Sequence, residues 1–161
     1  MMGTVISGGQ TGPDRAALEA AVATGTPYGG WCPKGGWAED MPEPPGLLAL
    51  YPNLRETLSD EPEQRTDWNV RDADALLVLV GLGGLEVSKG TERAMRHAES
   101  LGRPVCVVSV AEQEAEDRVR AFLSEFAGKP VCIAGPRESE SPGLQAEALR
   151  VLQPVLQTLA A

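Results

Sequence analysis

Residues 4–15 read Thr-Val-Ile-Ser-Gly-Gly-Gln-Thr-Gly-Pro-Asp-Arg. The β-branched pair near the start indicates a buried strand, the glycines a tight turn, and the proline the first turn of a helix. We therefore expect a strand at 5–7 that leads through the turn into a helix at 13–24. A strand, a glycine-rich turn and a helix in this order commonly bind an anion, because amides at the helix N-terminus point toward it.

The glycine spacing does not identify that anion. Gly8, Gly9 and Gly12 match neither the G-x-G-x-x-G of dinucleotide-binding domains nor a P-loop, since no lysine follows the last glycine. We expect free amides in the turn, beside the hydroxyls of Ser7 and Thr11. The alternative is a plain tight connection, in which Thr11 caps the helix and an acidic residue follows three positions later.

Strand and helix signals alternate along the rest of the chain. The strand-like runs are continuously apolar, which indicates a parallel sheet with helices over both faces. The expected strands are 5–7, 28–32, 75–80, 105–110 and 131–134, and the expected helices are 13–24, 63–72, 89–100, 114–126 and 142–159. We predict one three-layer α/β domain over residues 1–161, with 75–80 and 105–110 among its central strands. Pro154 should kink or end the last helix.

Composition narrows the class of protein. The chain has 161 residues and a formal net charge of −9, which argues against nucleic acid or an anionic membrane as a partner. No apolar run approaches the roughly 18–20 residues of a membrane span, and no signal-peptide pattern opens the chain, so we expect a cytoplasmic protein. Cys32, Cys106 and Cys132 lack metal-ligand spacing, and there is one histidine. We therefore expect reduced thiols, no protein-ligated metal and no Ser/His/Asp triad.

Loops that follow parallel strands meet at the carboxyl edge of the sheet, where ligands of open α/β sheets bind. The segments expected at this edge are 8–12, 33–46, 81–91 and 135–143. Ser88, Gly90 and Thr91 lie at a helix start that suits a phosphate, or that has only a plain N-cap. The Arg137 guanidinium either forms a bidentate contact to an oxyanion or forms a salt bridge with a nearby carboxylate.

Two other segments carry candidate polar residues. Arg65 and Asn69 are four apart and share one helix face, which we interpret as facing a ligand in preference to solvent. Lys34 and Glu39 lie in a proline- and glycine-rich excursion over 33–53. They either form a rim or lid of the site or are solvated charges of a loop.

Five motifs carry a family resemblance. In order they are Ser7-Gly-Gly-Gln-Thr-Gly-Pro-Asp-Arg-Ala-Ala-Leu18, Gly30-Trp-Cys-Pro-Lys-Gly35 with Ala38-Glu39-Asp40, Arg65-Thr-x-Trp-Asn-Val-Arg-Asp-Ala-Asp74, Ser88-x-Gly-Thr91 and Ala134-Gly-Pro-Arg-x-Ser-x-x-Pro-Gly143. Over nearly the whole chain they closely resemble the molybdenum carrier, or molybdenum-cofactor carrier, proteins. That family belongs to a wider group of Rossmann-like domains, which includes the lysine-decarboxylase-like LOG proteins that cleave cytokinin ribotides.

The resemblance implies a Rossmann-like α/β/α fold and a homo-oligomer, a dimer or a tetramer. It implies that the ligand is the molybdenum cofactor, a phosphorylated pterin dithiolene held for storage, protection and hand-over to molybdoenzymes. The cofactor's phosphate monoester suits a glycine loop at a helix start, and its metal oxo end needs donors such as Arg137, Ser139 or Lys34. The candidate ligand-binding residues are Ser7, Gly8, Gly9, Gln10, Thr11, Gly12, Lys34, Arg65, Asn69, Ser88, Gly90, Thr91, Arg137 and Ser139.

One departure separates this chain from its hydrolase relatives. Their motif Pro-Gly-Gly-x-Gly-Thr-x-x-Glu ends in a catalytic glutamate, whereas here Gly90-Thr91 is followed at that place by Ala94. Glu92 is two positions away and lies on another helix face. We therefore expect a carrier with no catalytic residue. The alternative is a nucleotide-derivative binder or a phosphoribohydrolase that draws a carboxylate from elsewhere, such as Glu39.

Overall fold

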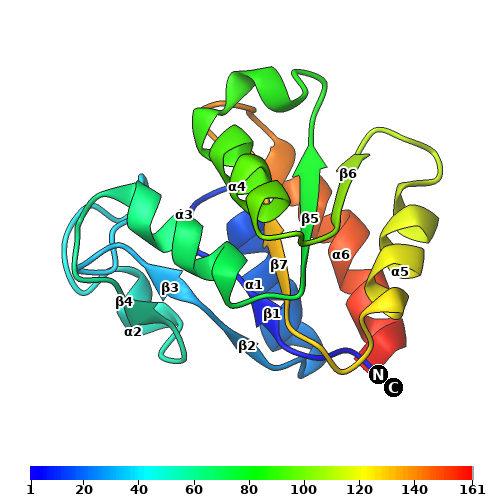
Figure 1. The fold of residues 1–161 in the computed structure, drawn as a ribbon, viewed down its shortest axis with the longest axis horizontal. Helices are drawn as coiled ribbons and strands as arrows, with labels where there is room; N and C mark the ends of the chain where they lie inside the picture. The colour runs from blue at the N-terminus through cyan, green and yellow to red at the C-terminus, as the bar shows by residue number, and fades with distance from the viewer. Residues whose placement is uncertain (161) are drawn as a thin grey trace.

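The computed structural model describes residues 1–160, which form a five-stranded sheet with helices on both faces (Figure 1). The strands are β1 (Val5–Ile6), β2 (Tyr28–Gly29), β5 (Ala75–Val80), β6 (Val105–Ser109) and β7 (Val131–Ala134). Their order across the sheet is β2-β1-β7-β5-β6, and all four pairings are parallel. The predicted three-layer, Rossmann-like α/β/α fold is confirmed.

The two layers of helices divide the core between them. The helices that cover the sheet are α1 (Pro13–Thr24), α3 (Pro62–Arg71), α4 (Lys89–Ser100), α5 (Ala115–Glu125) and α6 (Leu144–Ala160). Leu77 and Leu79 of β5 pack in one cluster with α1, α5 and α6, whereas Leu76 and Val78 pack in a second cluster with α3 and α4. Because successive strand residues point to opposite faces, this arrangement explains why the strand is apolar throughout.

The predicted position of one strand is wrong. β5 is central and all six of its residues are buried, as expected. β6, which the sequence placed among the central strands as 105–110, is one of the two edge strands, and four of its five residues are only partly buried. An apolar run reports that helices cover the faces of a strand, and it carries no information on whether both edges are paired. The second central position belongs to the shorter strand β7.

The last helix also departs from expectation. It begins at Leu144, not at 142, because Gly143 has a φ of +88°, outside the helical region. Pro154 does not end α6, which continues to Ala160. Leu152 and Val155, on either side of the proline, are both fully buried, so packing holds the helix together through this point.

The segment expected as one strand at 28–32 is split between two sheets. After β2, Gly30 adopts a φ of +132°, and β3 (Trp31–Cys32) then pairs with β4 (Arg55–Glu56) in a separate two-stranded parallel sheet. The excursion between β3 and β4 contains the short helix α2 (Leu47–Leu50), and its apolar residues pack in a small cluster with Leu18 of α1 and Cys32 of β3. A 3-10 turn, η1 (Leu85–Val87), precedes α4. Within residues 1–160, no helix has both the length and the hydropathy needed to cross a membrane.

Candidate functional site

A cavity of about 350 Å³ opens at the carboxyl edge of the sheet. Its walls come from the turn after β1, from α3, from the start of α4 and from the end of β7 with the loop that follows. Of the fourteen candidate residues, those that line it are Gly8, Gln10, Arg65, Asn69, Ser88, Gly90, Thr91 and Arg137. Three of the four segments predicted to meet here therefore line the cavity. The fourth, 33–46, also reaches this edge and bonds the segments 8–12 and 135–143 through Glu39, but it does not line the cavity, whose remaining wall is α3.

The cavity gathers positive charge in an acidic protein. Five of the fourteen Lys and Arg residues line it, against three of the twenty-three Asp and Glu residues. The basic residues are Arg65, Lys89, Arg93, Arg96 and Arg137, and the acidic ones are Asp14, Glu63 and Glu140. We call it the basic cavity. Local cations of this kind raise the concentration of anions against the field of the whole molecule.

The amides of Gly9, Thr11 and Gly12 are not free, so the prediction of free amides in the glycine turn is wrong for these three residues. The Gly9 amide donates to Ser7 Oγ at 3.1 Å, and the Thr11 amide donates to Gln10 Oε1 at 3.0 Å. The Gly12 amide donates to Gln145 Oε1 of α6 at 3.0 Å. Side chains of the protein thus take the place that an anion was expected to occupy.

The glycines of this turn make room for other parts of the protein. A Cβ on Gly12, whose φ is +87°, would lie 2.2 Å from the carbonyl oxygen of Pro136. A Cβ on Gly8 would lie 2.7 Å from Nη1 of Arg65, which donates to the Gly8 carbonyl at 2.9 Å. The alternative of a tight connection capped by Thr11 is wrong in detail too. Gly12 is the N-cap of α1, and Thr11 makes no capping bond.

Helix α4 offers the amides that the first turn does not. Ser88 is its N-cap and accepts the Thr91 amide at 3.2 Å and the Thr91 hydroxyl at 2.9 Å. The amides of Lys89 and Gly90 have no acceptor within residues 1–160, and a Cβ on Gly90 would meet nothing within 4 Å. Two unpaired amides at the positive end of a helix therefore face the basic cavity.

Helix α3 supplies two buried polar side chains with different roles. Arg65 is 8% exposed, and burial lowers the pKa of its guanidinium. Both polar atoms of the Asn69 side chain bond the backbone of Trp31, with Nδ2 donating at 2.9 Å and Oδ1 accepting at 2.7 Å. Asn69 lines the cavity but fixes β3 in place, so its polar atoms are already engaged.

Asp14 is a cavity residue that sequence reasoning missed. From the sequence, Asp14 was considered only as the acidic residue three positions after a Thr11 cap. Its side chain is in fact buried at the cavity beside Arg65. Burial raises the pKa of this carboxyl to about 6, against the lowering effects of Arg65, of the Gly135 amide and of Arg15. No signal in the sequence distinguishes such a carboxyl from an exposed one.

Arg137 leaves β7 and lies half-buried at the cavity. Its Nε is 3.7 Å from Oε2 of Glu140, and its amide donates to Oε1 of the same carboxylate at 3.1 Å. The salt bridge that was the alternative for Arg137 is therefore present, but it is long and leaves the guanidinium beside the cavity.

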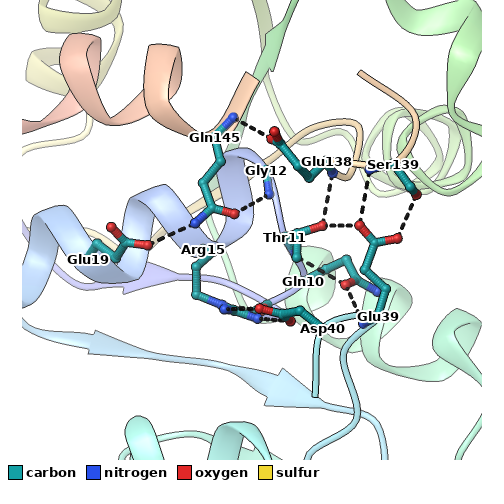
Figure 2. A network of polar contacts seen from close by, with 12 residues as sticks. Gln10, Thr11, Gly12, Arg15, Glu19, Glu39, Asp40, Glu138, Ser139 and Gln145 are labelled. Carbon is teal, nitrogen blue, oxygen red and sulfur yellow. Dashed lines mark hydrogen bonds and ion pairs between the residues drawn. The ribbon is translucent and has the colours of Figure 1, made fainter. Parts of the chain in front are cut away.

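A polar network joins the three loops around the glycine turn (Figure 2). Glu39 accepts hydrogen bonds from the Thr11 hydroxyl and from both the amide and the hydroxyl of Ser139. The Glu138 amide donates to Thr11 Oγ1 at 2.9 Å. Burial alone would raise the pKa of Glu39, but the hydrogen bonds from Ser139 and Thr11 outweigh burial and hold this pKa below its usual value. Glu39 is a structural tie between loops, so it is neither solvated nor in the cavity.

Six candidate residues lie outside the basic cavity. Those that shape the turn or its network are Ser7, Gly9, Thr11, Gly12 and Ser139. Lys34 lines a second cavity of about 330 Å³, with Trp37, Pro42 and Pro44. Pro62 lines both cavities.

Residues 1–160 contain no cluster of three or more potential metal ligands. Cys32 and Cys132 are buried and Cys106 is partly exposed, all as free thiols.

The family model described as "Circularly permutated YpsA SLOG family" matches residues 5–156. The chain belongs to this family. It is also similar to a crystal structure from Syntrophus aciditrophicus SB that is named "Putative molybdenum carrier protein". The two are 31% identical with a TM-score of 0.82, over 96% of this chain and 95% of the other. SLOG domains are LOG-like, so the family resemblance predicted from the motifs is confirmed. Comparison with curated proteins gives no match.

In this SLOG chain, the helix that carries the unpaired amides also carries Ala94. Its side chain is 3% exposed and lies at the wall of the basic cavity. The hydrolase motif would place its glutamate here. The methyl group of Ala94 has no proton to give or take.

Proposed function

We propose that this protein binds the molybdenum cofactor in the basic cavity, stores it and hands it over to molybdoenzymes without chemistry of its own. The observation that carries the proposal is the gathering of five of fourteen basic residues around one cavity in a chain of net charge −9. The molybdenum in the proposal comes from the name of the 31% identical protein. The phosphate in it is supported by the chemistry of the cavity.

The phosphate monoester of the cofactor fits the start of α4. The amides of Lys89 and Gly90 supply donors at the helix N-terminus, and the neighbouring cations supply charge. Arg137 is then the donor for the metal oxo end. Lys34 and Ser139 are not among the contacts to that end in this proposal, because neither lines the basic cavity; Lys34 lines the second cavity.

The size of the cavity is consistent with part of such a ligand. Small-molecule sites commonly measure about 300–1,000 Å³, and 350 Å³ lies at the lower end of this range. The second cavity, which shares Pro62 and contains Trp37, offers apolar surface for the rest of a larger ligand.

Ala94 favours a carrier over an enzyme. A specific observation nevertheless supports the alternative of a nucleotide-derived ligand, which is either sensed or hydrolysed. The family is LOG-like, and Asp14 is a buried carboxyl at the same cavity with a raised pKa. Incubation with AMP, followed by chromatography for free adenine, tests hydrolysis directly.

The proposed function is tested by purifying the protein without oxygen and identifying the released ligand by mass spectrometry. A molybdenum-containing pterin at close to one per binding site supports it, and a nucleotide or its derivative in that amount supports the alternative. Protein that leaves purification empty and does not take up isolated cofactor contradicts the proposal. We also propose a cytoplasmic homo-oligomer, a dimer or a tetramer, which light scattering on the purified protein tests.

A further inference from the structure

Asp14 is an unusual residue to find at an anion site. Its carboxyl is buried at the basic cavity, and no hydrogen bond from a side chain reaches it within residues 1–160. The groups that face it are Arg65 from α3, Arg15 from its own helix, Cys132 from β7, and the amides of Gln10 and Gly135. A carboxylate among cations attracts a proton less than an isolated one, but burial here outweighs the cations and raises the pKa to about 6.

The carboxyl of Asp14 belongs to the wall of the same cavity as the cations that would attract an oxyanion. Asp14 and Arg65 line the same cavity and interact with each other, so an oxyanion that binds the Arg65 guanidinium lies beside the Asp14 carboxyl. An ionised carboxylate and a bare oxyanion repel each other at such distances. A single proton between them turns the repulsion into a short, charge-assisted hydrogen bond.

Inorganic phosphate and sulfate differ in where the proton between the oxyanion and Asp14 comes from. Inorganic phosphate carries at least one proton throughout the pH range in which proteins are stable, and can donate it to an ionised Asp14. Sulfate carries none, so Asp14 itself must bind the proton before sulfate can enter. The two ions are otherwise alike in shape and in their ability to accept hydrogen bonds from amides and arginines.

We propose that Asp14 makes the basic cavity selective for oxyanions that still carry a proton above pH 6, such as inorganic phosphate, over those that carry none, such as sulfate. The proposal rests on the proposed function insofar as the cavity binds an oxyanion. According to this proposal, every oxyanion bound in the basic cavity shares one proton with Asp14. Binding of sulfate therefore takes one proton from solvent above pH 6. Binding of a phosphate monoester does the same above its second pKa near 6, because the monoester is then a dianion without a proton.

Calorimetric titration of the intact protein with sulfate and with inorganic phosphate, from pH 5.5 to 8.5, tests this. Sulfate affinity should fall about tenfold per pH unit above pH 6.5, while phosphate affinity changes far less. In Asp14→Asn, sulfate affinity should become independent of pH, and the preference for phosphate at pH 8 should disappear. Asn has the shape of Asp and keeps an oxygen that can accept the Gln10 and Gly135 amides. A melting curve checks that the variant is folded.

The wild-type protein alone also decides the question. Titration with sulfate at pH 7 in buffers of different ionisation enthalpy should show uptake of about one proton per bound ion. Sulfate binding with no proton uptake, or with the same pH profile in Asp14→Asn, overturns the role of Asp14 and leaves the anion site intact. If neither ion binds the wild-type protein at any pH, the oxyanion site of the proposed function fails, and this proposal fails with it.

Discussion

Replacing Asp14 by Asn should stabilise the protein at neutral pH, by an amount set by the environment of the carboxyl. Its pKa is raised from 3.8 to about 6 in the folded protein. The folded state therefore holds a proton more tightly than the unfolded state does. The stability that comes from this proton is complete below about pH 4 and is lost as the pH rises to about 6. A shift of about two units corresponds to a loss of about 3 kcal/mol at neutral pH.

Denaturant unfolding of wild type and Asp14→Asn at several pH values measures this loss. The free energy of unfolding of the variant, minus that of wild type, should increase by about 2 kcal/mol between pH 4.5 and 7, because part of the effect has already occurred at pH 4.5. Taking the difference removes groups that titrate equally in both proteins. Asp74→Asn, at an exposed carboxyl, is the control and should show no such change. A difference that stays constant with pH for Asp14→Asn would refute the reasoning.

Three further predictions concern the site and the turn beside it. Arg137→Ala should weaken the ligand about ten- to a hundredfold with little change in melting temperature, whereas Arg137→Lys recovers part of the affinity; a lower melting temperature with unchanged affinity would show a purely structural ion pair. Gly12→Ala should lower the free energy of unfolding by more than about 3 kcal/mol, because its Cβ would lie 2.2 Å from the Pro136 oxygen in addition to the backbone strain; Gly84→Ala, at similar backbone angles but with nothing within 4 Å, should cost only the strain, about 1–3 kcal/mol. With AMP as substrate, turnover should stay below about 1 s⁻¹, the low end for ordinary enzymes, and faster release of adenine would overturn the carrier assignment.

The elements that the sequence predicts best are those with an unambiguous local pattern. The strand Ala75–Val80 and the helix Lys89–Ser100 have the predicted bounds. In the first the apolar run is unbroken, and in the second a serine cap and the glycine after the last turn mark the ends. The edge position of β6 was not predictable in this way, because local pattern does not report which neighbours a strand pairs with.

The sequence predicted that a cavity lies at the carboxyl edge of the sheet, but not how the residues around it bond one another. The first turn was expected to bind an anion, but Gln145, more than a hundred residues away in the sequence, already occupies the Gly12 amide. Gly12 is needed because the loop after β7 passes close to it, which is again a long-range contact. The same limit explains why Asp14 was missed, since its burial depends on β7 and α3. Ser88, Gly90 and Thr91 were found because a helix start has a local signature.

The central claim, that the basic cavity holds a phosphorylated ligand at the start of α4, is tested most directly by titrating isolated cofactor into ligand-free protein without oxygen. Lys89→Glu removes a cation from the cavity at a helix position where an acidic residue is favourable, so the fold should be kept. Lys129→Glu makes the same change in charge just before β7, at the opposite edge of the sheet. The account predicts that Lys89→Glu weakens binding tenfold or more and that Lys129→Glu leaves it within about twofold of wild type. Equal effects of the two variants, or none from Lys89→Glu, would contradict it.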